Sequence, residues 1–159
     1  MRIISGGQTG VDRAALDIAI SLGIEYGGAV PGGRRAEDGP IDMRYDGLEE
    51  MASRRYRDRT EKNVRDADAT LVFTRGRPGD GTSHTIKYAG YSGKPFLVMD
   101  LLNKDLKEVT ENLRAWLHAT NPEVLNIAGP RESKAPGIYV EAFNILVTVF
   151  NSLLTIKPL

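Results

Sequence analysis

Two glycine-rich stretches follow apolar runs, and they hold the residue types best suited to bind an anion. The first is GGQTGVD at residues 6–12, directly after the apolar run at residues 2–5. Glycines let the backbone turn tightly, and free N–H groups at the start of a helix favour a phosphate. No Lys-Ser/Thr pair follows, so this is not a P-loop, and it is not a strict GxGxxG. We expect the phosphate to contact Gly6, Gly7, Gln8, Thr9 and Gly10; a tight turn without a ligand is the alternative.

The second stretch is GRPGDGTSHT at residues 76–85, after the apolar run at residues 69–74. Thr82 or Ser83 can cap the following helix or bond an anion. Two such loops at one edge of a sheet predict an anion or nucleotide site. We therefore add four residues to the site: Gly81, Thr82, Ser83 and His84.

Other polar residues are placed to complete this site. Asp12 lies in the first turn of a helix, where it caps the helix or contacts a ribose hydroxyl, a metal or an arginine. Arg34 and Arg35 belong to an irregular Gly/Pro-rich segment, residues 31–59, which predicts a mobile lid that closes over an anion. Arg131 and Ser133 follow the last apolar run; a solvent-facing ion pair is the alternative for that loop.

The residue types in the sequence give little support for metal or thiol chemistry. The chain has no cysteine, so disulfides, thiolate metal sites and a cysteine nucleophile are excluded. The two histidines, His84 and His118, lack HxH or HExxH spacing, so we expect no protein-built metal site. His118 ends a predicted helix and is interpreted as structural.

Five apolar runs alternate with helical segments, which predicts a single α/β domain over residues 1–159. The expected fold is a Rossmann-like three-layer sandwich with a parallel five-stranded sheet. Right-handed crossovers give the simplest strand order, 2-1-3-4-5. The expected strands are 2–5, 26–30, 69–74, 95–100 and 123–128, and the expected helices are 11–22, 60–67, 82–92, 105–118 and 137–154. Ligands would bind where the strand order reverses, beyond the carboxyl ends of strands one and three.

Charge and hydropathy exclude several partner classes. The chain has 21 basic and 21 acidic residues, so we expect neither nucleic-acid nor membrane-surface binding. The chain has no run of about 20 apolar residues, so we expect no transmembrane helix. Strand-like residues 2–5 leave no room for a signal peptide, so we expect a cytoplasmic protein. The segment 137–154 has apolar residues around most of its circumference, which predicts a homodimer or homotetramer interface; cover within the monomer is the alternative.

Five segments resemble the molybdenum cofactor carrier family over about residues 3–150: GGQTGVDRAALDIA, PGGRRAEDGPI, RTEKNVRDADATLVF, GTSHTIKYA and NIAGPRESKAPGIY. That family resembles Rossmann-like nucleotide-binding proteins that include the lysine-decarboxylase-like (LOG) phosphoribohydrolases. The resemblance implies a parallel α/β fold, oligomers, and a pocket for a phosphorylated or nucleotide-like ligand. Molybdenum cofactor, a pterin with a phosphate, fits that description.

One departure from the hydrolases bears on catalysis. Their PGGxGTxxE motif ends in a catalytic glutamate, whereas Thr85 stands at that position here. Threonine supplies no carboxylate for general acid–base chemistry. The sequence thus favours a carrier or binding protein. A nucleotide-processing enzyme that uses Asp12 or Glu37, and a nucleotide sensor, remain the alternatives.

Overall fold

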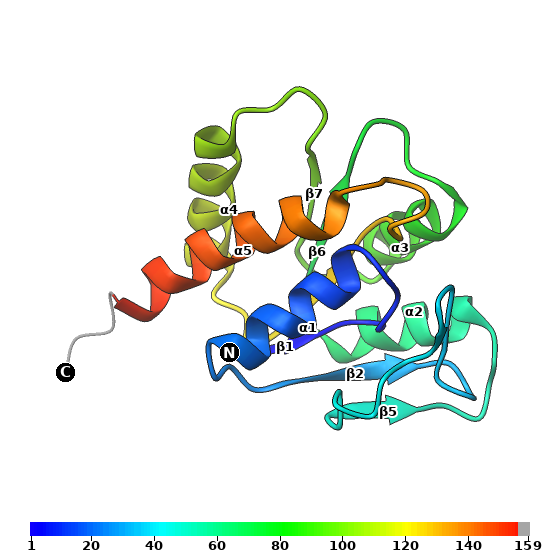
Figure 1. Cartoon of the computed structure of the whole chain (residues 1–159). Helices are drawn as coiled ribbons and strands as arrows, with labels where there is room; N and C mark the ends of the chain where they lie inside the picture. The colour runs from blue at the N-terminus through cyan, green and yellow to red at the C-terminus, as the bar shows by residue number, and fades with distance from the viewer. Residues whose placement is uncertain (156–159) are drawn as a thin grey trace.

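Strands and helices alternate along the chain, and the computed structural model describes residues 1–155. The strands are β1 (Arg2–Ile4), β2 (Tyr26–Val30), β3 (Arg35–Ala36), β4 (Gly39–Pro40), β5 (Leu48–Glu50), β6 (Ala69–Thr74), β7 (Phe96–Asp100) and β8 (Val124–Ala128). The helices are α1 (Val11–Ser21), α2 (Tyr56–Asp66), α3 (Asp80–Tyr91), α4 (Leu106–Thr120) and α5 (Ile138–Thr155). All five predicted strands and all five predicted helices are therefore present, with small shifts in their ends (Figure 1).

The central sheet is parallel, as predicted, but its strand count and order differ from the prediction. Within residues 1–155 six strands pair in the order β5-β2-β1-β8-β6-β7. The predicted order is wrong because β8 enters between β1 and β6 and pairs with both. The additional strand, β5, pairs with β2 at one edge. Leu48 is the one apolar residue among the three residues of β5. A strand this short, with one apolar residue, has no alternating pattern by which the sequence could reveal it.

Helices cover both faces of this sheet, which confirms the Rossmann-like α/β architecture. Helices α1, α4 and α5 pack together on one face, and α2 packs against α3 on the other. Every residue of β6 is buried, as expected for a central parallel strand covered on both sides. The main core joins the inner faces of α1, α4 and α5 to β1, β6 and β8. Short loops at the carboxyl ends of these strands then meet at one edge.

The segment 31–59 is packed and does not have the character of a mobile lid. It contains the β3–β4 hairpin and β5, and its Ile41 and Tyr45 are almost completely buried in a second small core. Arg34 does not close over an anion. Its guanidinium is buried and donates to the backbone carbonyl oxygens of Ile41 (3.0 Å), Asp42 (2.9 Å) and Tyr45 (3.1 Å).

Helix α5 is partly covered within the chain, since 33% of its residues are buried. It packs against α1 and α4, and its Ile138, Ala142, Leu146 and Phe150 are buried. The helix is long and apolar enough to cross a membrane, with a mean hydropathy of 1.5. Its place in the core accounts for that composition. Its apolar character alone therefore no longer implies an oligomer.

The role of Arg34 predicts a stability difference between two neighbouring arginines. Arg34→Met removes three hydrogen bonds from a buried charged donor, so it should lower the free energy of unfolding by about 3 kcal/mol. Arg35→Met is the matched control. The Arg35 side chain is exposed and donates to the carbonyl of Arg54, so its loss should change stability by less than about 1 kcal/mol. Urea denaturation measures both, and equal losses would show that Arg34 does not anchor the segment.

Candidate functional site

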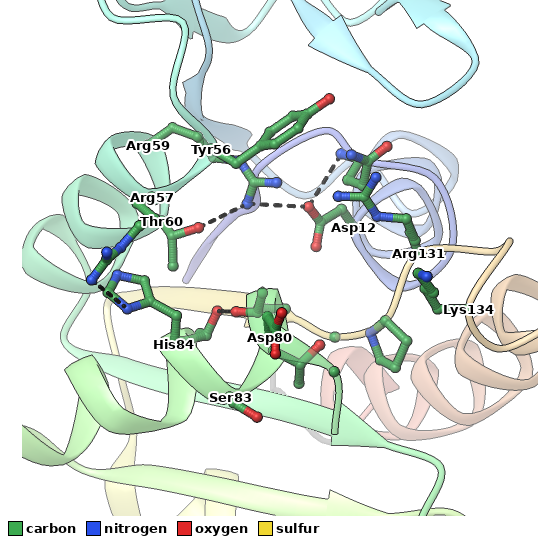
Figure 2. A pocket seen from close by; sticks show the side chains of 18 of the residues that line it. Asp12, Tyr56, Arg57, Arg59, Thr60, Asp80, Ser83, His84, Arg131 and Lys134 are labelled. Carbon is green, nitrogen blue, oxygen red and sulfur yellow. Dashed lines mark hydrogen bonds and ion pairs between the residues drawn. The ribbon is translucent and has the colours of Figure 1, made fainter. Parts of the chain in front are cut away.

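A cavity of about 800 Å³ opens at the carboxyl ends of β1, β8 and β6. Helices α2 and α3 form its other walls (Figure 2). The residues around it are Gln8, Asp12, Tyr56, Arg57, Arg59, Thr60, residues 79–85, Lys87, residues 128–131 and Lys134. Of the predicted site residues it contains Gln8, Asp12, Gly81, Thr82, Ser83, His84 and Arg131. The cavity therefore lies at the sheet edge expected for a ligand in this fold class.

The first glycine loop does not present the expected row of free N–H groups. The N–H of Gln8 donates to the Asp12 carboxylate (3.1 Å), and that of Thr9 donates to the Gln8 side chain (3.1 Å). The Val11 N–H donates to the carbonyl of Pro130 (3.3 Å). Side chains added at Gly7 and Gly10 would meet Ile41 and the Pro130 carbonyl, so these glycines serve packing. Three N–H groups of this turn are therefore already engaged within the protein, and a phosphate on this turn stays a prediction that the geometry does not favour.

Thr9 and Ser133 lie outside the cavity wall and join three loops through Glu37. Both hydroxyl groups donate to the Glu37 carboxylate, and the Ser133 N–H donates to it as well (3.1 Å). Partial burial opposes ionisation, but these hydrogen bonds hold the pKa of Glu37 below its usual value. Arg35, also outside the wall, donates to the Arg54 carbonyl (2.8 Å). Glu37 is thus a structural carboxylate that ties the loops together.

The second glycine loop does contribute to the cavity. The cavity is lined by residues 79–85, which include the first turn of α3. The first N–H groups of a helix lack partners within the helix and attract an anion. No side chain caps α3, which leaves this turn available. Thr85, at the position of the hydrolases' glutamate, is buried and donates to the Gly81 carbonyl (3.1 Å).

Asp12 and Arg59 form a buried ion pair between α1 and α2. The Asp12 Oδ2 atom lies 3.7 Å from Arg59 Nη1, with side-chain exposures of 3% and 11%. The guanidinium lies against Gly6, where any Cβ atom would collide with it. Burial raises the pKa of the Asp12 carboxyl, and Arg59 partly offsets this effect. The lack of a side chain at Gly6 therefore leaves room for the guanidinium in this position.

Cationic groups outnumber carboxylates around the cavity. Its walls carry five cationic side chains, Arg57, Arg59, Lys87, Arg131 and Lys134, and two carboxylates, Asp12 and Asp80. Most of the cations were missed from sequence, as were the neighbouring Tyr56 and Thr60. The arginine-rich composition of residues 34–77 was the available signal, but it equally fits a solvated surface. The excess positive charge suits an anionic ligand.

His84 is held between two charged side chains at one side of the cavity. Its Nε2 atom lies 3.0 Å from Glu61 Oε1, and its Nδ1 atom lies 3.5 Å from the Arg57 guanidinium. Figure 2 shows His84 beside Arg57, across the opening from Asp12. Among residues 1–155, no group of three or more His, Asp or Glu side chains gathers to hold a metal ion.

The Asp12–Arg59 pair predicts a pH-dependent stability defect. Arg59→Met leaves the buried carboxylate unpaired, which should cost about 3 kcal/mol at neutral pH. The pKa of Asp12 should rise further, because the positive charge that lowers it is gone. A raised carboxyl pKa means that the folded state holds the proton more tightly than the unfolded chain. The variant should therefore be most stable below the ordinary carboxyl pKa and lose stability as the pH rises through the raised pKa of Asp12, more steeply than the parent.

The double variant Asp12→Asn/Arg59→Met is the control, because it has no buried carboxylate to ionise. Its free energy of unfolding should lack the extra slope. Chemical denaturation at a series of pH values measures all three proteins. The same slope in both variants would mean that Asp12 is not its source.

Comparison with known proteins places the chain in a family. The model of the circularly permutated YpsA SLOG family matches residues 3–150. A crystal structure of a protein from Syntrophus aciditrophicus SB, provisionally named molybdenum carrier protein, is 45% identical. The match covers 94% of this chain and 93% of that one, with a TM-score of 0.89. No curated protein matches. The chain therefore belongs to the circularly permutated YpsA SLOG family.

Proposed function

We propose that this protein binds and carries a phosphorylated small molecule of the pterin or nucleotide type in the cavity between α2 and α3. The observation that carries the proposal is the excess of cationic side chains around a cavity that the uncapped first turn of α3 also faces. A phosphate at that turn would accept from the first N–H groups of α3 and meet Arg57 or Lys87. A cavity of about 800 Å³ is in the size range of small-molecule sites.

Molybdenum cofactor is the first candidate for the cargo. The relative from Syntrophus is named for carrying molybdenum, and the cofactor joins a pterin to a phosphate. The cavity fits such a molecule in charge, since cations surround it, and it also offers the flat groups of Tyr56 and Arg131. The metal would arrive with the cargo and would need no protein ligands.

A nucleotide-processing enzyme is the second candidate, and Asp12 is the observation in its favour. A carboxyl group with a raised pKa in a cavity suits general acid chemistry. Against this, the Asp12 carboxylate already accepts from Gln8 and is paired with Arg59. Glu37, the other carboxylate considered, lies outside the cavity wall. Incubation with nucleoside monophosphates separates the candidates, because an enzyme would release free base and a carrier would not.

Three further expectations complete the proposal. The protein acts in the cytoplasm, as a homodimer or homotetramer, and its partner is a small molecule rather than nucleic acid or membrane. Sedimentation at micromolar concentration tests the assembly, since a mass near the 17.4 kDa of one chain would contradict it. Phe150 is unsuitable for a dissociating variant because it is buried in the core. Val140, which is 59% exposed on α5, is the position to change.

The proposed function predicts which cations control binding. Arg57→Gln and Lys134→Gln each remove a charge from the cavity, so each should weaken binding of inorganic phosphate or a mononucleotide by about tenfold. Lys107→Gln is the matched control, because that side chain is exposed on α4, away from the cavity. Calorimetry measures the affinities, and native mass spectrometry identifies any ligand carried through purification. Equal affinities in all four proteins would refute the proposed anion site.

A further inference from the structure

The amide of Gln8 has one end fixed by the protein and the other end unpartnered. The residue is 4% exposed and contributes to the cavity wall. Its Oε1 atom accepts from the backbone N–H groups of Thr9 (3.1 Å) and Glu37 (2.9 Å). Two N–H donors fix that end as the oxygen, so the NH₂ group must be the other end. This buried Nε2 atom has no hydrogen-bond partner among the described residues.

Arg59, which also lines the cavity, carries a second unpartnered donor. Its Nε atom is buried and, within residues 1–155, finds no acceptor. Its Nη1 atom donates to Thr60 Oγ1 (3.2 Å), which leaves Nε without a role in the protein. Buried donors are rarely left unpaired in native proteins. Two of them at one cavity indicate that a ligand atom with lone pairs completes the wall.

A phosphate is the wrong partner for these donors, because Asp12 lies among them. Asp12 Oδ2 accepts from the Gln8 N–H and faces Arg59, so the ion pair is already neutral overall. An added phosphate would be repelled by the carboxylate. The Asp12 carboxylate also interacts with the Ser5 hydroxyl, which itself donates to the Ile127 carbonyl (2.6 Å), and its oxygens keep lone pairs for a ligand N–H. This wall therefore offers donors and an acceptor side by side, without excess charge.

We propose that the wall formed by Gln8, Asp12 and Arg59 recognises the hydrogen-bonding edge of the ligand's planar heterocycle. That edge must present a lone pair next to an N–H, as the lactam of a pterin or guanine and the amidine of adenine do. Figure 2 shows Arg59 and Asp12 pointing toward each other on one side of the opening, with His84 and Asp80 on the other. The ring thus lies against α1 and α2, and the phosphate lies at α3. This inference rests on the proposed function and gives the ligand its orientation.

Flat groups at the same end of the cavity support a ring there. The Arg131 guanidinium lies 5.3 Å from the centre of the Tyr56 ring, and both residues line the cavity. Guanidinium and aromatic faces are the surfaces on which planar heterocycles stack. The α3 end, by contrast, offers small hydroxyl residues and a helix N-terminus, which suit a phosphate.

The test uses Gln8→Glu, which replaces the free NH₂ group with an oxygen and keeps an acceptor for the Thr9 and Glu37 N–H groups. The probes are GMP, AMP and a pterin that bears one phosphate, each compared with ribose 5-phosphate, which has no ring edge to read. In the parent, at least one ring-bearing probe should bind about tenfold more tightly than ribose 5-phosphate. In the variant this advantage should disappear, while ribose 5-phosphate should lose only the smaller factor due to the added charge.

Asp80→Asn is the matched control, because Asp80 is the cavity carboxylate at the phosphate end. It should change the affinity of every probe by a similar factor and preserve the ring advantage. A ring advantage that survives in Gln8→Glu, or one that is absent in the parent, overturns the inference. Failure of all probes, including ribose 5-phosphate and inorganic phosphate, would instead overturn the proposed function. Thermal unfolding confirms that each variant is folded.

Discussion

The buried ion pair between Asp12 and Arg59 is the constraint around which the sheet edge is built. Two charges removed from water need to face each other, and they need hydrogen bonds to most of their remaining donors and acceptors. The Gln8 N–H supplies one of those bonds, and the Thr60 hydroxyl supplies another. The guanidinium occupies the space where a side chain at Gly6 would begin. The pair thereby links α2 to the first turn of α1 at one wall of the cavity.

The loops around this pair satisfy one another rather than a ligand. Glu37 collects hydrogen bonds from Thr9 and Ser133, and Arg131 lies 3.9 Å from it. The same side chains that a pattern search assigns to phosphate binding are therefore engaged in holding three loops in register. Near the ion pair, the buried side-chain atoms of described residues that lack a partner are Gln8 Nε2 and Arg59 Nε, and both residues line the cavity. This division explains how one edge of the sheet can be both well ordered and available to a ligand.

Local pattern predicted the elements of this fold well, because each strand is a short apolar run and each helix has its own periodicity. The order of the strands could not be predicted in this way. The sequence of residues 124–128 does not indicate that this strand pairs with both β1 and β6, since the pairing depends on how the helices pack.

About half of the candidate site could be predicted, because some of its residues are placed by local structure and others by distant contacts. Residues 81–84 start a helix next to a central strand, which is a local property. The role of Arg59 depends on a contact across 47 positions of sequence, and that of Arg34 on carbonyl groups within a packed segment.

The position of β8 in the sheet is consistent with the family's description as circularly permutated. If β8 and α5 are counted first, the order β5-β2-β1-β8-β6-β7 becomes 4-3-2-1-5-6, in which the chain winds outward from the centre in two directions.

In the order that the ribosome follows, however, the central strand is made after the five strands that flank it. Until residues 124–128 emerge, β1 and β6 have no partner between them, and their facing edges remain unpaired. Exposed edges of this kind invite mispairing, and long-range parallel pairing is slow. The cavity shares this timing, because residues 128–131 and Lys134 supply one of its walls. The wall of the cavity is therefore complete only once β8 has entered the sheet.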